Sequence, residues 1–290
     1  MTRTLAALAC ALLLTTAGCA GLDGSNAGTE TVPMQTTVDA TEVSTTATSY
    51  TTTESAEQLA PGVTETAVVN ARALADAHRD ALGAGFVKYS AATRENESTT
   101  AIWTRTFGFE NESVWRLTTT GENTPVALDV TNGTMDQYGG GEYVLWRLDD
   151  ADTGNTSYGV RSITIDGDGQ PIPADKVFKN NYQSLYEHSL IYSLASNADS
   201  VKALDASEGA VELSGTAGNP STEFTKTSDV EFTMSVADSG FVTAIDLAYE
   251  SGDGTVQSTV TFDTDVTDPV EEPDWYGSAL NETGLNESGP

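Results

Sequence analysis

Runs of alternating apolar and polar residues are the feature that most restricts how this chain can fold. The clearest pair of such runs is Val230 to Val236 and Phe241 to Tyr249. In both runs alternate side chains are mainly apolar, and the turn Asp238-Ser239-Gly240 joins the two. Such alternation gives an antiparallel strand one covered face and one solvated face. The chain is therefore expected to build an antiparallel sheet with other elements packed against one side.

Further strand-like runs are separated by turn residues at roughly ten-residue spacing. We predict them at residues 86–94, 101–109, 113–119, 126–131, 143–148, 157–165, 210–214 and 255–262. Two helices are expected. The first covers 71–82, between an Asn70 cap and Gly83, and the second covers 176–195, with an apolar stripe at helical spacing. This order predicts an α+β fold, in which a strongly curved antiparallel sheet follows one helix and carries the second on its concave face.

The first sixty residues are expected to direct export and to tether the protein. The N-terminal segment has the features of a secretory signal peptide: a basic residue at Arg3, an apolar stretch from Leu5 to Leu14 and small residues before Cys19. The apolar stretch is too short to span a bilayer. We predict a signal peptide at 1–18, a lipidated Cys19 that begins a Thr-rich disordered stalk over 19–60, a single domain at 61–276 and a disordered tail at 277–290.

Charge narrows the setting in which such a domain can be stable. The chain has 13 Lys plus Arg against 43 Asp plus Glu, a formal net charge of −30, whereas a small soluble domain typically carries a charge of magnitude roughly 2 to 8. Near 1 M salt the screening length falls to about 3 Å, which suppresses the repulsion between carboxylates. We therefore expect a protein of a high-salt environment, and the charge argues against nucleic acid as a partner.

The sequence carries six N-x-S/T sequons, the acceptor pattern for N-glycosylation in exported proteins. They are at Asn96, Asn111, Asn132, Asn155, Asn281 and Asn286. Most are predicted to lie in turns between strands, where a glycan could be accommodated. These six residues are candidates for modification.

The order and spacing of several segments resemble a family of haloarchaeal secreted lipoproteins of unassigned function. The segments are the signal with its Ala-Gly-Cys19 ending, Ala60-Pro61-Gly62-Val63, the helix from Asn70 to His78, the strand meander and the closing Pro273-Asp-Trp-Tyr276. The architecture is similar to the LolA/LppX-like half-barrels. That resemblance implies an incomplete barrel wrapped around a helix, with a cavity that holds acyl chains. It also implies attachment to the outer face of the cell membrane through lipid on Cys19.

No catalytic constellation is identifiable in the sequence. The only histidines, His78 and His188, lack a motif context, and no G-x-S-x-G is present. Asp166-Gly-Asp168-Gly-Gln170 resembles the opening of a calcium loop, but Pro171 stands where the EF-hand requires glycine. Outside Cys10 and Cys19 there is no cysteine for a disulfide or thiolate site. We expect no enzyme activity, no cofactor and no metal site.

Large aromatic residues are the remaining candidates for a functional site. They could line a cavity for a lipid or another apolar ligand, or they could fill the core between a curved sheet and a helix. The candidate ligand-lining residues are Trp103, Trp115, Trp146, Tyr182 and Tyr186. The sequence thus favours a non-enzymatic binder or carrier of an apolar ligand. The alternatives are an envelope interaction or structural protein with a filled core and, less favoured, a hydrolase.

Overall fold

The structure is a computed structural model, and it describes residues 56–94, 100–124, 130–165, 168–204, 210–220, 229–251, 254–265 and 270–285. The signal segment, Cys19 and the Thr-rich stalk up to residue 55, like most of the predicted strand at 126–131, lie outside the described residues. The folded part begins with a small hairpin of β1 (Gln58–Ala60) and β2 (Val63–Thr64). Ala60 is buried, so the folded part starts slightly before the predicted boundary at residue 61.

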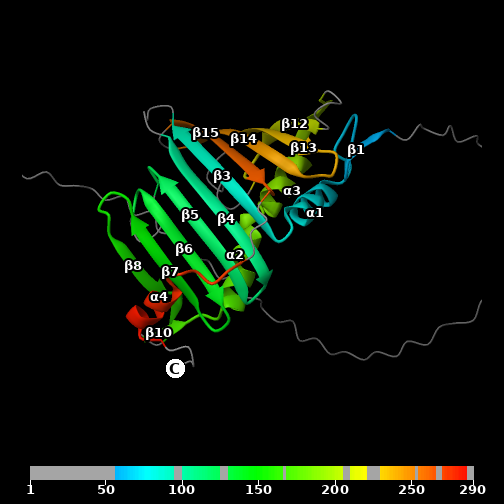
Figure 1. The fold of residues 1–290 in the computed structure, drawn as a ribbon. Coiled ribbons are helices and arrows are strands. Elements are labelled where there is room, and N and C mark those ends of the chain that lie inside the picture. Colours follow the sequence, from blue (N-terminus) through cyan, green and yellow to red (C-terminus); the bar gives the residue numbers. More distant parts are fainter. Residues whose placement is uncertain are drawn as a thin grey trace, which may run out of the picture. The chain divides into compact units, whose positions relative to one another are not determined.

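Eleven strands form one antiparallel sheet, shown face-on in Figure 1. The spatial order is β11-β12-β13-β14-β15-β3-β4-β5-β6-β7-β8, and every neighbouring pair is antiparallel. The strands are β3 (Gly85–Arg94), β4 (Ala101–Asn111), β5 (Val114–Glu122), β6 (Gly133–Gly140), β7 (Val144–Asp150), β8 (Thr156–Val160), β11 (Ala198–Ala203), β12 (Ala210–Ala217), β13 (Val230–Ala237), β14 (Val242–Ser251) and β15 (Gly254–Asp263). The sheet is open, with β11 and β8 as its edges.

The two predicted groups of strands join into this single sheet because β3 pairs with β15. Between β8 and β11 the chain forms a hairpin of β9 (Ser162–Ile165) and β10 (Asp168–Pro171), then helices α2 (Ala174–Leu185) and α3 (His188–Ser196). This connection carries the chain from one edge strand to the other. Its helices contribute to the core on the way.

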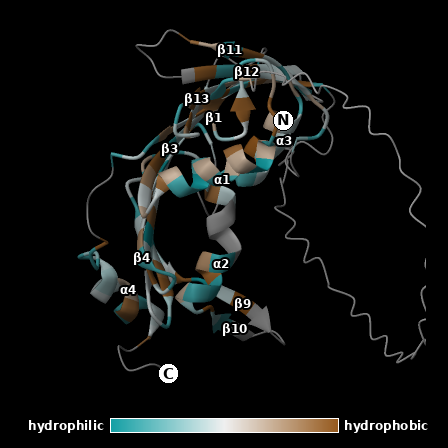
Figure 2. Ribbon diagram, turned by 90° about the vertical axis from the view of Figure 1, so that its right-hand side faces the viewer, coloured by the Kyte–Doolittle hydropathy of each residue, from teal (hydrophilic) through white to brown (hydrophobic). Residues whose placement is uncertain are grey.

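The sheet is strongly curved, and helices α1 (Ala71–Leu82) and α2 lie on its concave side (Figure 2). The main hydrophobic core fills this side, where buried residues of α1, α2 and α3 pack against strand residues such as Phe86, Leu213 and Ile245. The convex-facing positions of the central strands are instead rich in Thr and acidic residues, for example Thr259 and Asp246. The predicted curved antiparallel sheet with helix on its concave face is confirmed.

The predicted disordered tail at 277–290 is wrong for its first half. Helix α4 covers Tyr276–Thr283 and lies on the opposite side of the sheet from α2 (Figure 2). There Ala279, Leu280 and Trp275 form a second, smaller hydrophobic cluster with Tyr138 and Leu145. The sequence signal for this helix is weak because few of its side chains are apolar. Its stability comes from packing on the sheet.

The single helix predicted over 176–195 is two helices, because Glu187 adopts a left-handed conformation with φ +51°. The apolar stripe continues through the break, so periodicity could not reveal it. The carboxylate of Glu187 forms a buried ion pair with Lys88 of β3. This contact lies between residues 99 positions apart in sequence, which explains why local pattern does not predict it.

Strands β1, β2, β6, β10 and β11 were not predicted, and the single strand predicted at 157–165 is two strands, β8 and β9. In β6 the sequence Gly-Thr-Met-Asp-Gln-Tyr-Gly-Gly lacks alternation, and its last two residues were expected to belong to a turn. Residues 168–171 were also expected in a Gly-rich turn but form β10. Among the described residues, no helix combines the length and the apolar composition needed to cross a membrane.

Candidate functional site

Three tryptophans face the concave side of the sheet, and each lies directly across from a glycine on the next strand. The pairs are Trp103 with Gly121, Trp115 with Gly139, and Trp146 with Gly159. Alternation along β4 places Trp103 on the same face as the core residue Phe107. A glycine in a strand permits close approach of another group to the backbone, so each indole has room to lie against the sheet.

Two of these pairs show the close approach directly. A Cβ added at Gly139 would lie 2.5 Å from Nε1 of Trp115, and one added at Gly159 would lie 2.2 Å from ring carbon Cζ2 of Trp146. Both distances are shorter than any normal contact, so no larger residue fits under either ring. The indoles of Trp115 and Trp146 therefore cover the backbone of the neighbouring strand.

Exposure separates the predicted ligand-lining residues into two groups. Trp115 is 3% exposed and donates a hydrogen bond from Nε1 to the carbonyl of Ala174 (3.2 Å), which fixes the start of α2. Tyr186 is also buried and packs against Phe86, with ring centroids 5.4 Å apart. Trp103 and Trp146 are half-buried. Burial places Trp115 and Tyr186 in the core, while the side chain of Tyr182 lies outside the described residues.

We call Trp103, Trp146 and the concave-facing residues between them the indole surface. Those residues are Thr119, Met135 and Leu148, which lie in one row across β5, β6 and β7. All three are buried at the floor of the sheet, in contrast to the two half-buried indoles. The indole surface thus combines an apolar floor with large aromatic side chains that are not fully covered.

Cationic side chains lie beside the indole surface on the same concave face. Lys88 and Arg105 are directly across from one another on β3 and β4, and Lys88 is paired with Glu187. On the far side, Arg161 follows β8 and donates from Nε to Oε1 of Gln137 at 2.9 Å. Gln137 is itself buried and lies directly across from Trp146. Cationic side chains therefore lie on both sides of the indole surface, together with Glu187, which pairs with Lys88.

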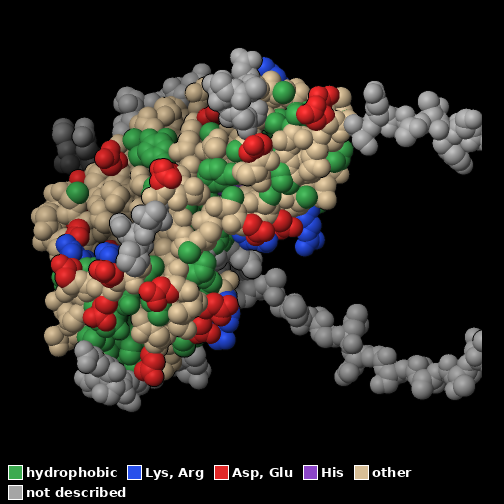
Figure 3. All heavy atoms as spheres, turned by 45° about the vertical axis from the view of Figure 1, so that its right-hand side comes forward, with side chains coloured by type: hydrophobic (Ala, Val, Ile, Leu, Met, Phe, Trp, Pro, Cys, Tyr) green, Lys and Arg blue, Asp and Glu red, His purple; other side chains and the backbone are tan. Residues whose placement is uncertain are grey.

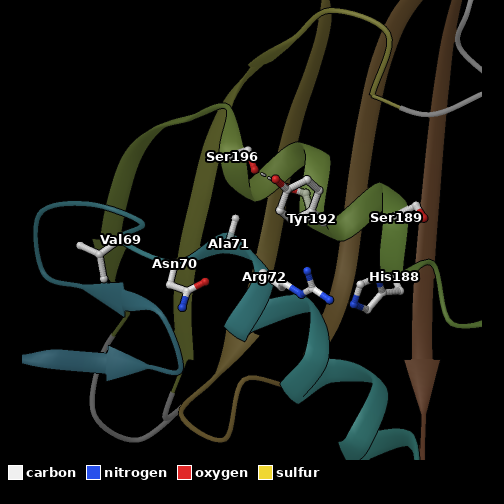
Figure 4. Close-up of a pocket in the computed structure, with 8 residues that line it drawn as sticks. All are labelled: Val69, Asn70, Ala71, Arg72, His188, Ser189, Tyr192 and Ser196. Atoms are coloured by element: carbon white, nitrogen blue, oxygen red, sulfur yellow. Dashed lines mark hydrogen bonds between the residues drawn. The ribbon is translucent and has the colours of Figure 1, made fainter. Parts of the chain in front are cut away.

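A separate pocket of about 570 Å³ lies between the start of α1 and helix α3 (Figure 4). Two exposed apolar side chains line it, Val69 at 67% and Tyr192 at 48% exposure. Arg72 and His188 extend toward each other across it. This pocket is amphipathic, and sequence reasoning missed it because its residues come from segments more than a hundred positions apart.

His188 in this pocket is held by an acid. Its Nε2 lies 3.0 Å from Oδ1 of Asp76, and this hydrogen bond, with the nearby charges of Arg79 and Arg72, holds the pKa of Asp76 below its usual range. Ser196, also in the pocket, donates its hydroxyl proton to the carbonyl of Tyr192. In the described part of the chain, no serine hydroxyl forms a hydrogen bond with His188, so a nucleophile and base pair is not assembled here.

His78 is a core residue of the α1–sheet interface. It is fully buried, its Nδ1 accepts a hydrogen bond from the backbone N–H of Val242 (3.1 Å), and its ring contacts Phe241 and Phe262. Burial lowers its pKa to about 3, so the ring is neutral near pH 7. Among the residues that the structure describes, no group of three or more His, Cys, Asp or Glu side chains could hold a metal ion.

The glycosylation candidates lie at several kinds of position. Asn111 ends β4 and caps the following turn, where its Oδ1 accepts from the N–H groups of Ser113 and Val114. Asn155 is exposed between β7 and β8, and Asn281 is exposed on α4, whereas the side-chain amide of Asn132 donates to Asp152. Asn96 and Asn286 lie outside the described residues, as does Cys19. Modification of any of them stays a prediction.

A polar network on the convex side was also missed by sequence reasoning. Asp136 accepts hydrogen bonds from Arg116 at both oxygens (2.9 and 2.6 Å), and from Nε1 of Trp275 at 2.7 Å. Trp275 belongs to the Pro273-Asp-Trp-Tyr276 segment noted in the sequence. The segment therefore attaches α4 to the convex face of the sheet.

Comparison with known proteins identifies neighbours among solved structures only. No protein-family model matches the sequence, and no curated protein matches it. A DUF1329 family protein from Desulfovibrio piger is 8% identical, with 71% of this chain and 95% of that chain covered and a TM-score of 0.29. A domain assigned to outer membrane lipoprotein sorting, from Vibrio parahaemolyticus, is 10% identical, with coverages of 73% and 99% and a TM-score of 0.28.

A LolA superfamily protein from Nitrosomonas europaea is a third neighbour, 8% identical, with coverages of 67% and 92% and a TM-score of 0.22. The haloarchaeal family and the LolA/LppX-like resemblance of the sequence stay predictions. Because the identities and TM-scores are low, the description of the fold rests on the observed sheet and its helices.

Proposed function

We propose that this protein is a binder or carrier of an apolar ligand such as a lipid, which it holds on the indole surface. One observation carries the proposal: Trp103 and Trp146 lie on the concave side of the sheet and remain half-buried. Large aromatic side chains on a concave face are a common lining for apolar ligands. Covering such a surface contributes roughly 25 cal/mol per Å² of apolar area removed from water.

The close contact of Trp146 with the backbone at Gly159 is compatible with this role. A ring that lies flat against the neighbouring strand projects little into the space above the sheet, so it forms a floor instead of filling the volume. Trp115 lies on Gly139 in the same way but is buried, and its Nε1 donates to the carbonyl of Ala174 at the start of α2, so exposure and not glycine pairing distinguishes Trp103 and Trp146. The proposal therefore assigns the ligand to the Trp103–Trp146 region.

The first test is to purify the protein from its own host and to extract bound molecules for mass spectrometry. We expect an apolar or amphipathic molecule at near-stoichiometric amount. A double variant, Trp103→Ala with Trp146→Ala, should lose most of it. Tyr89→Ala is the matched control, because Tyr89 is an exposed aromatic residue on the opposite face of β3. Extraction of nothing apolar from the wild-type protein would contradict the proposal.

We further propose that the protein acts at the outer face of the cell membrane of a halophilic archaeon, attached through lipid on Cys19. The signal-like start supports export, and the net charge of −30 supports a high-salt setting. Acidic side chains are dispersed over the face shown in Figure 3, as expected for a surface hydrated at high salt. Cys19→Ser should release the mature protein from membranes into the medium, and unchanged membrane association would contradict the anchor.

The pocket between α1 and α3 favours a second candidate function, binding of another envelope protein. Val69 and Tyr192 are among the few large apolar side chains left exposed, and they lie together with Arg72 and His188. Clustered exposed apolar residues rimmed by polar ones are typical of interaction sites. Cross-linking in cells should capture a partner at Tyr192 if this candidate is correct, and Tyr192→Ser should abolish the product.

A further inference from the structure

One cation on the concave face differs from the eight in the described part of the chain that pair with carboxylates. Of the 13 Lys and Arg residues, all except Arg3 and Lys226 lie in that part. Eight of these described cations have a carboxylate within 4.0 Å, namely Arg72, Arg79, Lys88, Arg116, Arg147, Lys176, Lys179 and Lys202. Arg161 instead donates to an amide oxygen, that of Gln137, and among the described residues no carboxylate lies within 4.0 Å of it.

This exception is notable because carboxylates outnumber cations more than threefold, 43 to 13. A half-buried guanidinium loses part of its hydration, and a carboxylate partner would normally compensate for that loss. Burial alone lowers the pKa of Arg161, with no opposing contribution from a nearby acid. Arg161 therefore has unused capacity to bind an anion, since its planar guanidinium can form two parallel hydrogen bonds to a carboxylate or phosphate.

Position connects Arg161 to the indole surface. It lies two residues after Gly159, the glycine that the Trp146 ring covers, and its backbone N–H donates to Val144, so it continues the concave face of β8. Its partner Gln137 lies directly across from Trp146. Because β8 is an edge strand, Arg161 and Trp146 lie close to this edge of the sheet, and the guanidinium reaches inward to Gln137 on β6.

From the Arg161 edge, the indole surface continues inward over apolar residues. Leu148 and Met135, already buried by protein atoms, lie between Trp146 on β7 and Trp103 on β4, three strands away, so the two half-buried indoles are the part that a ligand can cover. Three strand spacings correspond to about 14 Å. A molecule that covers this surface must therefore have a long apolar part, and its polar end would lie at the edge beside the guanidinium.

Building on the proposed function, we propose that the ligand is a long-chain anionic amphiphile, whose carboxylate or phosphate head binds Arg161 and whose apolar chain lies over Trp146 toward Trp103. The acidic head of the ligand is then the counterion of Arg161, for which the described part of the chain provides no carboxylate. The head group alone contributes little binding free energy at a site that salt can reach. Binding therefore requires both the head group and the apolar chain of the ligand. Neutral lipids of the same length would cover the indoles but leave the guanidinium without a counterion.

The test is equilibrium dialysis in molar KCl at pH 8 with three probes: palmitate, hexadecanol and a sixteen-carbon alkyl phosphate. We expect the wild-type protein to bind palmitate and the alkyl phosphate at least tenfold more tightly than hexadecanol. Arg161→Met should reduce binding of both acids to the level of hexadecanol and leave hexadecanol unchanged. Arg161→Lys should restore part of the difference. Acetate and inorganic phosphate should not bind, which distinguishes an amphiphile from a free anion.

Arg147→Met is the matched control, because Arg147 lies on the opposite face and pairs with Asp149. It should leave all three affinities unchanged. Equal binding of palmitate and hexadecanol by the wild-type protein would overturn this inference and leave the proposed function standing. Failure to bind any of the three would contradict both. Should Arg161→Met not fold, the wild-type comparison of acid with alcohol decides the question by itself.

Discussion

The two halves of the sheet differ in what covers their concave faces. In the half that contains β12 to β15, concave-facing side chains such as Leu213, Met234 and Ile245 are fully buried against helices α1 and α3. In the half from β4 to β8, α2 also lies on the concave side, but Trp103 and Trp146 stay half-buried, and α4 packs on the convex side. A single sheet thus contains a filled core and a partly uncovered aromatic surface.

The difference shows that strand pattern and strand coverage are separate properties. Both halves contain strands that alternate apolar and polar residues, and these strands specify which face turns inward. What lies on that face depends on where the connecting helices pack. The break at Glu187, held by Lys88, directs α3 toward the β12 half and leaves α2 near β6. We expect substitutions in the two halves to act on different properties, stability in the first and ligand binding in the second.

The largest expected effect is in the filled half. Ile245→Ala should lower the free energy of unfolding by about 2–5 kcal/mol, because it removes buried methyl groups and leaves a cavity. Trp103→Ala should cost less although it removes more atoms, since the indole is already partly exposed. Urea unfolding in molar salt measures both values. Equal losses in the two variants would remove the distinction between the halves.

Next in size is the convex attachment of α4. Asp136→Ala would leave Arg116 and Trp275 without their acceptor, and loss of a hydrogen-bonded charge in a buried site should cost about 2–3 kcal/mol. Limited proteolysis should then release the segment that contains α4 before the rest of the domain unfolds. Thr118→Val, which removes only a 3.2 Å hydrogen bond to the same carboxylate, serves as the milder control. Loss of the whole fold at once would mean that α4 is not a separable element.

The filled half should also respond to acid through His78. Its pKa is lowered by burial from 6.5 to about 3, so below pH 6.5 the unfolded chain binds a proton that the folded protein does not. Stability from this group is therefore complete above pH 6.5 and falls by about 1.4 kcal/mol per pH unit toward pH 3. Wild-type and His78→Gln proteins should differ in the change of unfolding free energy between pH 7 and pH 5. Parallel pH profiles would contradict a neutral buried His78.

The smallest expected effect on stability is at the glycine under Trp146. Gly159→Ala should cost about 1–2 kcal/mol, because its Cβ would displace the ring, and it should weaken ligand binding. Gly277→Ala is the matched control: nothing lies within 4 Å of its added Cβ, and alanine favours helix α4 by about 0.5–1 kcal/mol. Unchanged binding in Gly159→Ala would show that the flat position of the indole is not required.

Particular residues show how far local pattern predicts this structure. The Asn70 cap and the run to Leu82 predict α1 correctly, with the Asn70 side chain accepting from Ala73 as expected. Strands β13, β14 and β15 agree with their predicted ranges to within a few residues. By contrast, β6 and α4 have weak patterns and are stabilised by neighbours distant in sequence. The tryptophans were identified as candidates, but their glycine partners and Arg161 were not.

The sequence by itself determined the alternation of the strands, the inward face of the sheet and the order of helix and strand, because these depend on residues only two to four positions apart. Only the tertiary structure decided that β3 pairs with β15, that the indoles lie on glycines of adjacent strands, and that Arg161 is next to Trp146. Each of these contacts joins segments whose separation along the chain exceeds the reach of any local period. Their formation depends on how the whole sheet and its helices pack.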